Sequence, residues 1–175
     1  MNTRFDIPHS RFNQITKQQL SEVGVKVLVE SEACGVHLAV SPDGLQLVFF
    51  QGHPEYDSFS LLKEYKREID RWFNNQRQDY PPFPENYFSD ELQQNLINFQ
   101  ATAIDAKSKQ QALPQWDEQW IVKQIDNTWR DTTLSTFNNW LGMVYKLTHK
   151  DVSLHLMPGI DPENPLDPEA IDPYR

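Results

Sequence analysis

The sequence contains little cysteine, few basic residues and no long apolar run, and each shortage excludes a class of protein. Its single cysteine, Cys34, excludes an internal disulfide framework and any metal site built from several thiolates. Sixteen Lys and Arg against 25 Asp and Glu give a net charge of -9, which opposes binding to nucleic acid, and no lysine-rich patch favours a membrane surface. No stretch reaches the roughly 18 apolar residues of a membrane helix. We therefore expect a protein of the reducing cytoplasm, without nucleic-acid or membrane partners.

Three short apolar runs in the first third of the chain predict a sheet. Residues 25–29 alternate valine with other side chains, residues 36–40 form a second β-branched run, and residues 45–50 are almost wholly apolar. The sequence Ser41-Pro42-Asp43-Gly44 carries the proline and glycine of a type I turn, so the second and third runs are expected to form a hairpin. The composition of residues 45–50 also predicts a strand that is buried on both faces.

After the sheet, apolar side chains recur at steps of three and four, which predicts helices. Residues 59–73 form the clearest pattern. They predict an amphipathic helix of about four turns, with Asp57 or Ser58 as its N-cap.

The rest of the chain combines helices with two segments rich in proline. Residues 79–88 are expected to form an irregular loop whose interleaved aromatic rings pack onto the body. Prolines and acidic residues from residue 157 exclude a regular element, which divides the chain into a body of residues 1–156 and a tail of residues 157–175. Helices are expected over the remaining periodic segments, residues 89–111, 116–125 and 134–147.

The segment from Gln51 to Asp57, Gln-Gly-His-Pro-Glu-Tyr-Asp, is the strongest candidate for a site that carries chemistry. It follows a predicted strand, and sites form at the carboxyl ends of strands in open α/β sheets. Residues two apart in extended backbone project to the same side, so His53 and Glu55 can face one cleft. Glu55 would then orient the imidazole, and His53 would act as a general base. The His-x-Glu pattern alone is a weak signal, because a histidine at a strand end is more often a capped surface residue.

Other reactive side chains have simpler interpretations. Cys34 lies between two predicted strands, without a helix N-terminus or a basic neighbour that would activate its thiol. Arg67 falls on the polar side of its predicted helix, which is typical of a solvated arginine. His9 and Arg11 either line the site or tie a loop to the body, and Tyr56 is interpreted as a helix-entry residue. No set of His, Cys and carboxylates has the spacing of a metal site.

Seven blocks of sequence, taken in order, resemble those of a known enzyme family. They are Pro8-His9-Ser10-Arg11, Leu28-Val29-Glu30-Ser31-Glu32 with Gly35-Val36-His37-Leu38 after it, Gly52-His53-Pro54-Glu55-Tyr56-Asp57, Lys63-Glu64-Tyr65, Pro84-Glu85-Asn86-Tyr87-Phe88, Trp129-Arg130 and Asn139-Trp140-Leu141. Their order and similar gaps, from residue 5 to about residue 150, are far more specific than one short motif. On these residues the chain resembles the homoserine O-succinyltransferase family.

The resemblance implies a fold and a set of site residues. The family fold is an α/β sheet with flanking helices, like that of the class I glutamine amidotransferases (flavodoxin-like), and this chain would form its carboxy-terminal half. The family's catalytic triad is Cys, His and Glu, and the motif that holds its His and Glu is matched by His53 and Glu55. The arginine that holds the carboxylate of the amino-acid substrate is matched by Arg67.

The resemblance also implies a reaction. An acyl group passes from succinyl-CoA or acetyl-CoA to the Cys thiolate, and then to the hydroxyl of L-homoserine for methionine biosynthesis. Coenzyme A is a co-substrate, no bound cofactor or metal is implied, and a homodimer is expected. The family's nucleophile lies upstream of the block matched by residues 8–11, so we expect an amino-terminal half to supply it and this chain alone to be inactive.

Two other functions stay open at this point. The same fold supports glutamine hydrolysis with a similar Cys, His and Glu set, although the blocks at Glu64-Tyr65 and at residues 84–88 favour acyl transfer. Alternatively, the chain binds an amino acid or a partner without reacting. The sequence determines neither the acyl group of the donor nor the choice between homoserine and serine as acceptor.

Overall fold

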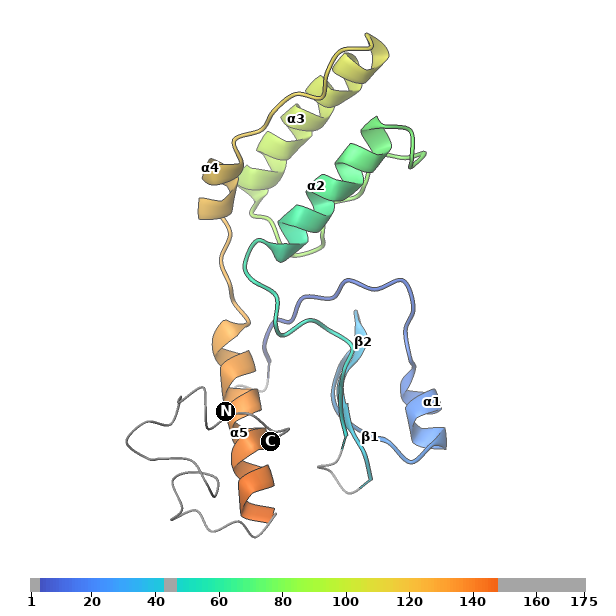
Figure 1. Cartoon of the computed structure of the whole chain (residues 1–175), viewed down its shortest axis with the longest axis vertical. Helices are drawn as coiled ribbons and strands as arrows, with labels where there is room; N and C mark the ends of the chain where they lie inside the picture. The colour runs from blue at the N-terminus through green and yellow to red at the C-terminus, as the bar shows by residue number, and fades with distance from the viewer. Residues whose placement is uncertain (1–3, 43–46, 148–175) are drawn as a thin grey trace, which may run out of the picture. The chain divides into compact units, whose positions relative to one another are not determined.

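The computed structural model describes residues 4–42 and 47–147, and these residues form a three-stranded sheet and five helices (Figure 1). The chain divides into two compact units, Met1–Leu134 and Ser135–Arg175. The sheet, the first four helices and the predicted site belong to the first unit. The fold is therefore of the α/β kind that the sequence predicts, with strands first and helices after. The tail of residues 157–175 lies outside the described residues.

The sheet is antiparallel, in the order β1-β2-β3. Its strands are β1 (Lys26–Ser31), β2 (Gly35–Val40) and β3 (Val48–Phe50). All residues of β2 after its first glycine are buried, because strands pair with β2 on both edges. The three predicted strands are confirmed, whereas the predicted turn between β2 and β3 lies partly outside the described residues, which omit 43–46.

One expectation about the sheet is wrong, namely that the third strand is buried on both faces. Phe49 and Phe50 are 39% and 44% exposed. Among the described residues β3 pairs with β2 alone, so it is an edge strand. An apolar composition shows that the side chains of a strand can be buried, and it does not identify the element that covers the strand.

The sequence predictions do not include a short helix that precedes the sheet. Helix α1 (Lys17–Glu22) begins with a capping box, in which the Thr16 side chain accepts from the Gln19 N–H and the Gln19 side chain accepts from the Thr16 N–H. Its Leu20 packs with Val36 and Ala39 of β2.

The core of the first unit lies among helices α2 (Ser60–Phe73), α3 (Asp90–Ser108) and α4 (Glu118–Lys123). Helices α2 and α3 lie side by side in Figure 1. The predicted apolar face of α2 is confirmed, because its Leu62, Tyr65 and Ile69 join Leu92 and Leu96 of α3 and Ile121 of α4 in one buried cluster.

The proline-rich loop and the starts of the helices refine the sequence predictions. Residues 79–88 are irregular, and their aromatic side chains pack against the helical core as predicted. The predicted N-cap of α2 is wrong. Phe59 holds the N-cap position without a side-chain bond, and it follows a turn in which the Asp57 carbonyl accepts the Ser60 N–H at 3.0 Å.

The last helix, α5 (Arg130–Leu147), begins where Asn127 Oδ1 accepts the Arg130 N–H at 2.9 Å. It confirms the predicted final helix. None of the helices in residues 4–42 and 47–147 is long and apolar enough to span a membrane.

Candidate functional site

The predicted His53–Glu55 pair lies in the loop between β3 and α2, and three backbone hydrogen bonds hold this loop. The Gln51 N–H donates to the His37 carbonyl at 2.8 Å, which extends the pairing of β2 with β3. The His53 N–H donates to the Pro8 carbonyl at 2.8 Å, and the Tyr56 N–H donates to the His53 carbonyl at 3.2 Å. The loop is thus tied to the sheet and to the segment of residues 8–11.

Both nitrogens of the His53 ring have an oxygen partner. Nδ1 lies 2.8 Å from Glu55 Oε1, and Nε2 lies 3.1 Å from the Ser10 carbonyl oxygen. A carboxylate and a carbonyl only accept hydrogen bonds, whereas a neutral imidazole has a single N–H. The protonated ring therefore satisfies both contacts, and the neutral ring satisfies one. The structure brings His53 and Glu55 together as predicted, but across a turn closed by the Tyr56 N–H and the His53 carbonyl and not in extended backbone.

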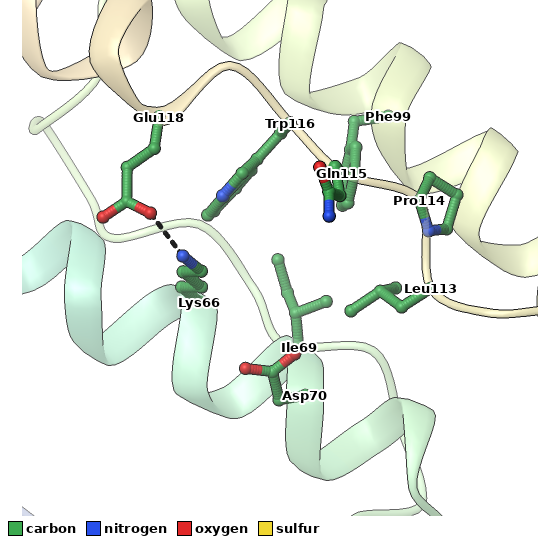
Figure 2. Close-up of a pocket in the computed structure, with 9 residues that line it drawn as sticks. All are labelled: Lys66, Ile69, Asp70, Phe99, Leu113, Pro114, Gln115, Trp116 and Glu118. Atoms are coloured by element: carbon green, nitrogen blue, oxygen red, sulfur yellow. Dashed lines mark hydrogen bonds and ion pairs between the residues drawn. The ribbon is translucent and has the colours of Figure 1, made fainter.

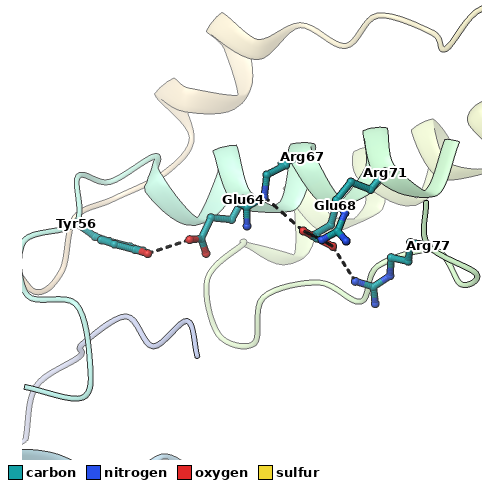
Figure 3. Close-up of polar contacts among 6 residues, drawn as sticks. All are labelled: Tyr56, Glu64, Arg67, Glu68, Arg71 and Arg77. Carbon is teal, nitrogen blue, oxygen red and sulfur yellow. Dashed lines mark hydrogen bonds and ion pairs between the residues drawn. The ribbon is translucent and has the colours of Figure 1, made fainter. Parts of the chain in front are cut away.

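The face of the His53 ring is covered by Tyr56. The two rings stack with centroids 4.2 Å apart and planes inclined by 15°. The Tyr56 hydroxyl donates to Glu64 Oε1 at 2.9 Å (Figure 3), and Trp129 Nε1–H donates to the Tyr56 carbonyl at 2.9 Å. Burial, followed by the Glu64 carboxylate, raises the pKa of Tyr56 to about 12, so its phenol stays neutral and donates.

Arg11 ties the amino-terminal segment across the sheet. Its guanidinium donates to His9 Nδ1 at 2.6 Å, to the Gln51 carbonyl at 3.4 Å and to the Cys34 carbonyl. Burial, then the charge of Arg11 and then that of His53, lowers the pKa of His9. These contacts tie the amino-terminal segment to the body, as one of the two interpretations of His9 and Arg11 predicts.

Gly52 lies where three side chains approach the backbone. A Cβ at this position would be 2.6 Å from Ile7 Cγ2, 2.8 Å from His37 Nδ1 and 3.0 Å from His9 Nε2. His37 is buried on β2, and burial lowers its pKa to about 4, so it is neutral at neutral pH. The absence of a side chain at Gly52 lets residues 7–9 pack against the loop.

Arg67 lies on the exposed side of α2. Its side chain is 62% exposed and its Nε lies 3.4 Å from Glu68 Oε1. Glu68 also accepts from Arg71 and Arg77 at 3.2 Å each (Figure 3). Within the described residues, no hydrogen bond or ion pair joins Arg67 to His53 or Glu55. The structure therefore does not bring the predicted substrate-binding arginine into contact with the pair.

The single cysteine lies in the turn between β1 and β2, as predicted. The Cys34 N–H donates to Ser31 Oγ at 3.0 Å, and its carbonyl is held by Arg11. In residues 4–42 and 47–147, no group of three or more His, Cys, Asp and Glu could hold a metal ion.

Two hollows open on the first unit. One, of about 430 Å³, lies beside Glu55 and is lined by the loop and by residues around the start of α5, among them Asn127, Arg130 and Thr133. The other, of about 380 Å³, lies against α2, where the tilted rings of Phe99 and Trp116 lie near the ion pair of Lys66 with Glu118 (Figure 2). The first adjoins the predicted pair, and both are lined by polar and apolar side chains.

Residues 1–150 match the family described as homoserine O-succinyltransferase. The chain belongs to this family.

Three relatives named homoserine O-succinyltransferase each match 166 residues, or 95% of this chain. Those of Methylobacter tundripaludum and Methylococcus capsulatus are 57% and 52% identical over 47% of their own length. That of Nitrosococcus oceani is 55% identical over 46% of its length. The chain therefore spans about half the length of the curated relatives it matches.

Two features of this family member's site were not predicted from the sequence. Tyr56, interpreted as a helix-entry residue, covers the face of His53. Ser10, 43 residues away in the sequence, contacts His53 through its backbone carbonyl. A backbone contact does not require a particular residue type, so residue type alone does not indicate it. The sequence signal for both was their place in the blocks that resemble the family.

Replacing Gly52 by alanine is expected to destabilise the fold by about 1–3 kcal/mol, because the new methyl group must displace Ile7, His37 or His9. Chemical denaturation measures the free energy of unfolding. Gly142→Ala is the matched control, since a Cβ there has no atom within 4 Å and helical alanine is favoured by about 0.5–1 kcal/mol. Equal stability of Gly52→Ala and the wild type would contradict the close packing at Gly52.

Proposed function

We propose that this chain is the carboxy-terminal half of a homoserine O-succinyltransferase, in which His53 is the general base and Glu55 orients it. The 2.8 Å contact between His53 Nδ1 and Glu55 Oε1, in a chain of this family, carries the proposal. The whole enzyme would have a fold like that of the class I glutamine amidotransferases. It would act in the cytoplasm as a homodimer and use coenzyme A only as part of its co-substrate.

In the first step, a cysteine thiolate supplied by the amino-terminal half attacks the thioester carbonyl of succinyl-CoA or acetyl-CoA. A carbon–sulfur bond to the enzyme forms, and the bond to the sulfur of coenzyme A breaks. His53 holds the proton of the cysteine and gives it to the leaving thiolate. Glu55 stabilises the imidazolium while the ring is charged.

In the second step, the hydroxyl of L-homoserine attacks the acyl-enzyme. His53 takes the hydroxyl proton and returns it to the departing cysteine sulfur. The product is an O-acyl-homoserine, which belongs to methionine biosynthesis. Nδ1 is hydrogen-bonded to Glu55, so Nε2 is the nitrogen that transfers the proton. Nε2 must therefore leave its contact with the Ser10 carbonyl and form a hydrogen bond with the reacting group instead.

Arg67 would hold the carboxylate of homoserine. Its guanidinium is well exposed, and among residues 4–42 and 47–147 its one ion-pair partner is the neighbouring Glu68 at 3.4 Å, so a substrate carboxylate can reach it. A guanidinium can bind a carboxylate through two parallel hydrogen bonds.

The test uses a chimaera in which this chain replaces the segment that it matches in the Methylobacter tundripaludum relative. We expect the chimaera to transfer a succinyl or acetyl group from coenzyme A to L-homoserine. We expect His53→Gln to lower kcat by about 10²–10⁴-fold, because it removes the base, and Glu55→Gln to lower it less. Free coenzyme A and acylated homoserine are the products to measure.

A folded chimaera without transferase activity would contradict the proposal, as would a His53→Gln variant with wild-type kcat. Glutamine hydrolysis without transfer to homoserine would favour the hydrolase alternative instead.

A second prediction concerns Arg67. We expect Arg67→Ala to raise the KM for L-homoserine by about tenfold or more, since a charged hydrogen bond is lost, and to leave the KM for the acyl donor unchanged. Arg71→Ala is the matched control, because Arg71 lies on the same helix and also pairs with Glu68. If the two substitutions changed the KM for L-homoserine equally, Arg67 would act only through its ion pair with Glu68 and would not bind the substrate.

A further inference from the structure

We infer that Tyr56 is a positioning residue for the reaction, because its ring holds the imidazole of His53 in the plane that lets Nδ1 meet Glu55 and leaves Nε2 for proton transfer. The inference rests on the proposed function of His53. This positioning role for Tyr56 follows neither from the His-x-Glu pattern nor from the names of the relatives.

The first support is the geometry of the stack. With centroids 4.2 Å apart and planes at 15°, the phenol ring covers one face of the imidazole. The ring of His53 can turn about its χ2 angle only by moving against this face. Rotation would also break the 2.8 Å contact with Glu55, so Tyr56 and Glu55 restrict the same torsion from the face and from the edge.

The second support is that Tyr56 is itself held at both ends. Its hydroxyl donates to Glu64 Oε1 on α2, and its backbone carbonyl accepts from Trp129, which is buried. These two contacts fix the tyrosine to α2 and to the buried indole. A tyrosine ring that is fixed in this way can restrict the rotation of the His53 ring, whereas a mobile ring could not.

The experiment compares Tyr56→Leu with Tyr56→Phe in the chimaera. Leucine removes the aromatic face, and we expect kcat to fall by about tenfold to hundredfold, because the base loses its alignment. The KM values for donor and acceptor should change by less than about twofold, since Tyr56 is proposed to act on His53 and not on the substrates. Phenylalanine keeps the ring and loses only the contacts of the hydroxyl with Glu64 and Ser10, so we expect it to recover most of kcat.

Three kinetic outcomes would overturn the inference. They are an unchanged kcat in Tyr56→Leu, an equal loss in Tyr56→Phe, and a change confined to KM. The last would make Tyr56 a substrate contact.

A second measurement decides the inference even if the wild-type chimaera is inactive and the proposed function fails. NMR of labelled histidine in the 175-residue chain reports the ring current of Tyr56 at His53, with His53→Gln assigning the signal among the five histidines. We expect an upfield displacement in the wild type and in Tyr56→Phe, and its loss in Tyr56→Leu. Equal His53 shifts in all three proteins would show that Tyr56 does not hold the ring.

Discussion

The hydrogen bond from the His53 N–H to the Pro8 carbonyl, 2.8 Å long, joins two segments that neither helix nor sheet would bring together. Residues 8–11 have no regular structure of their own, so their place depends on such contacts. Once Pro8 is fixed, the Ser10 carbonyl reaches Nε2 of the same histidine, and Arg11 reaches backbone carbonyls of the sheet. The approach is possible only because Gly52 carries no side chain.

The consequence is a histidine that is held from three directions. Glu55 contacts one edge of the ring, the Ser10 carbonyl contacts the other, and Tyr56 covers a face. Glu55 and Tyr56 belong to the same loop as His53, Ser10 comes from the amino-terminal segment, and Tyr56 is anchored by Glu64 and Trp129. In the proposed mechanism this restraint would favour proton transfer, because rotation of the ring away from its partners would compete with it.

Local periodicity predicted most of the secondary structure. The three-and-four spacing that identified α2 also identified its buried face, including Leu62 and Ile69, because one helix face meets one core. The sequence also predicted that His53 faces Glu55, although the two residues meet across a turn and not in extended backbone. The sequence predictions do not include helix α1, although Thr16 and Gln19 form a capping box, since Leu20 is the one apolar residue among residues 17–22 and a single position makes no periodic pattern.

The errors and omissions concern the neighbours of each segment. The exposure of Phe49 and Phe50 depends on which elements flank β3, and an apolar run does not contain that information. The carbonyls of Pro8 and Ser10 act from more than 40 residues away through backbone atoms, which no side-chain pattern encodes. Tyr56 was assigned to the start of a helix because its stacking partner could be known only from the fold of the loop.

We propose that this chain supplies the proton-transfer half of an acyltransferase site. The experiment mixes the chimaera with succinyl-CoA in the absence of an acceptor, and follows the intact mass of the protein before and after L-homoserine is added. We expect an acyl adduct on a cysteine of the amino-terminal half, which homoserine discharges rapidly when His53 is present and slowly in the His53→Gln variant. An adduct that forms and discharges equally fast without His53, or that resides on Cys34, would contradict it.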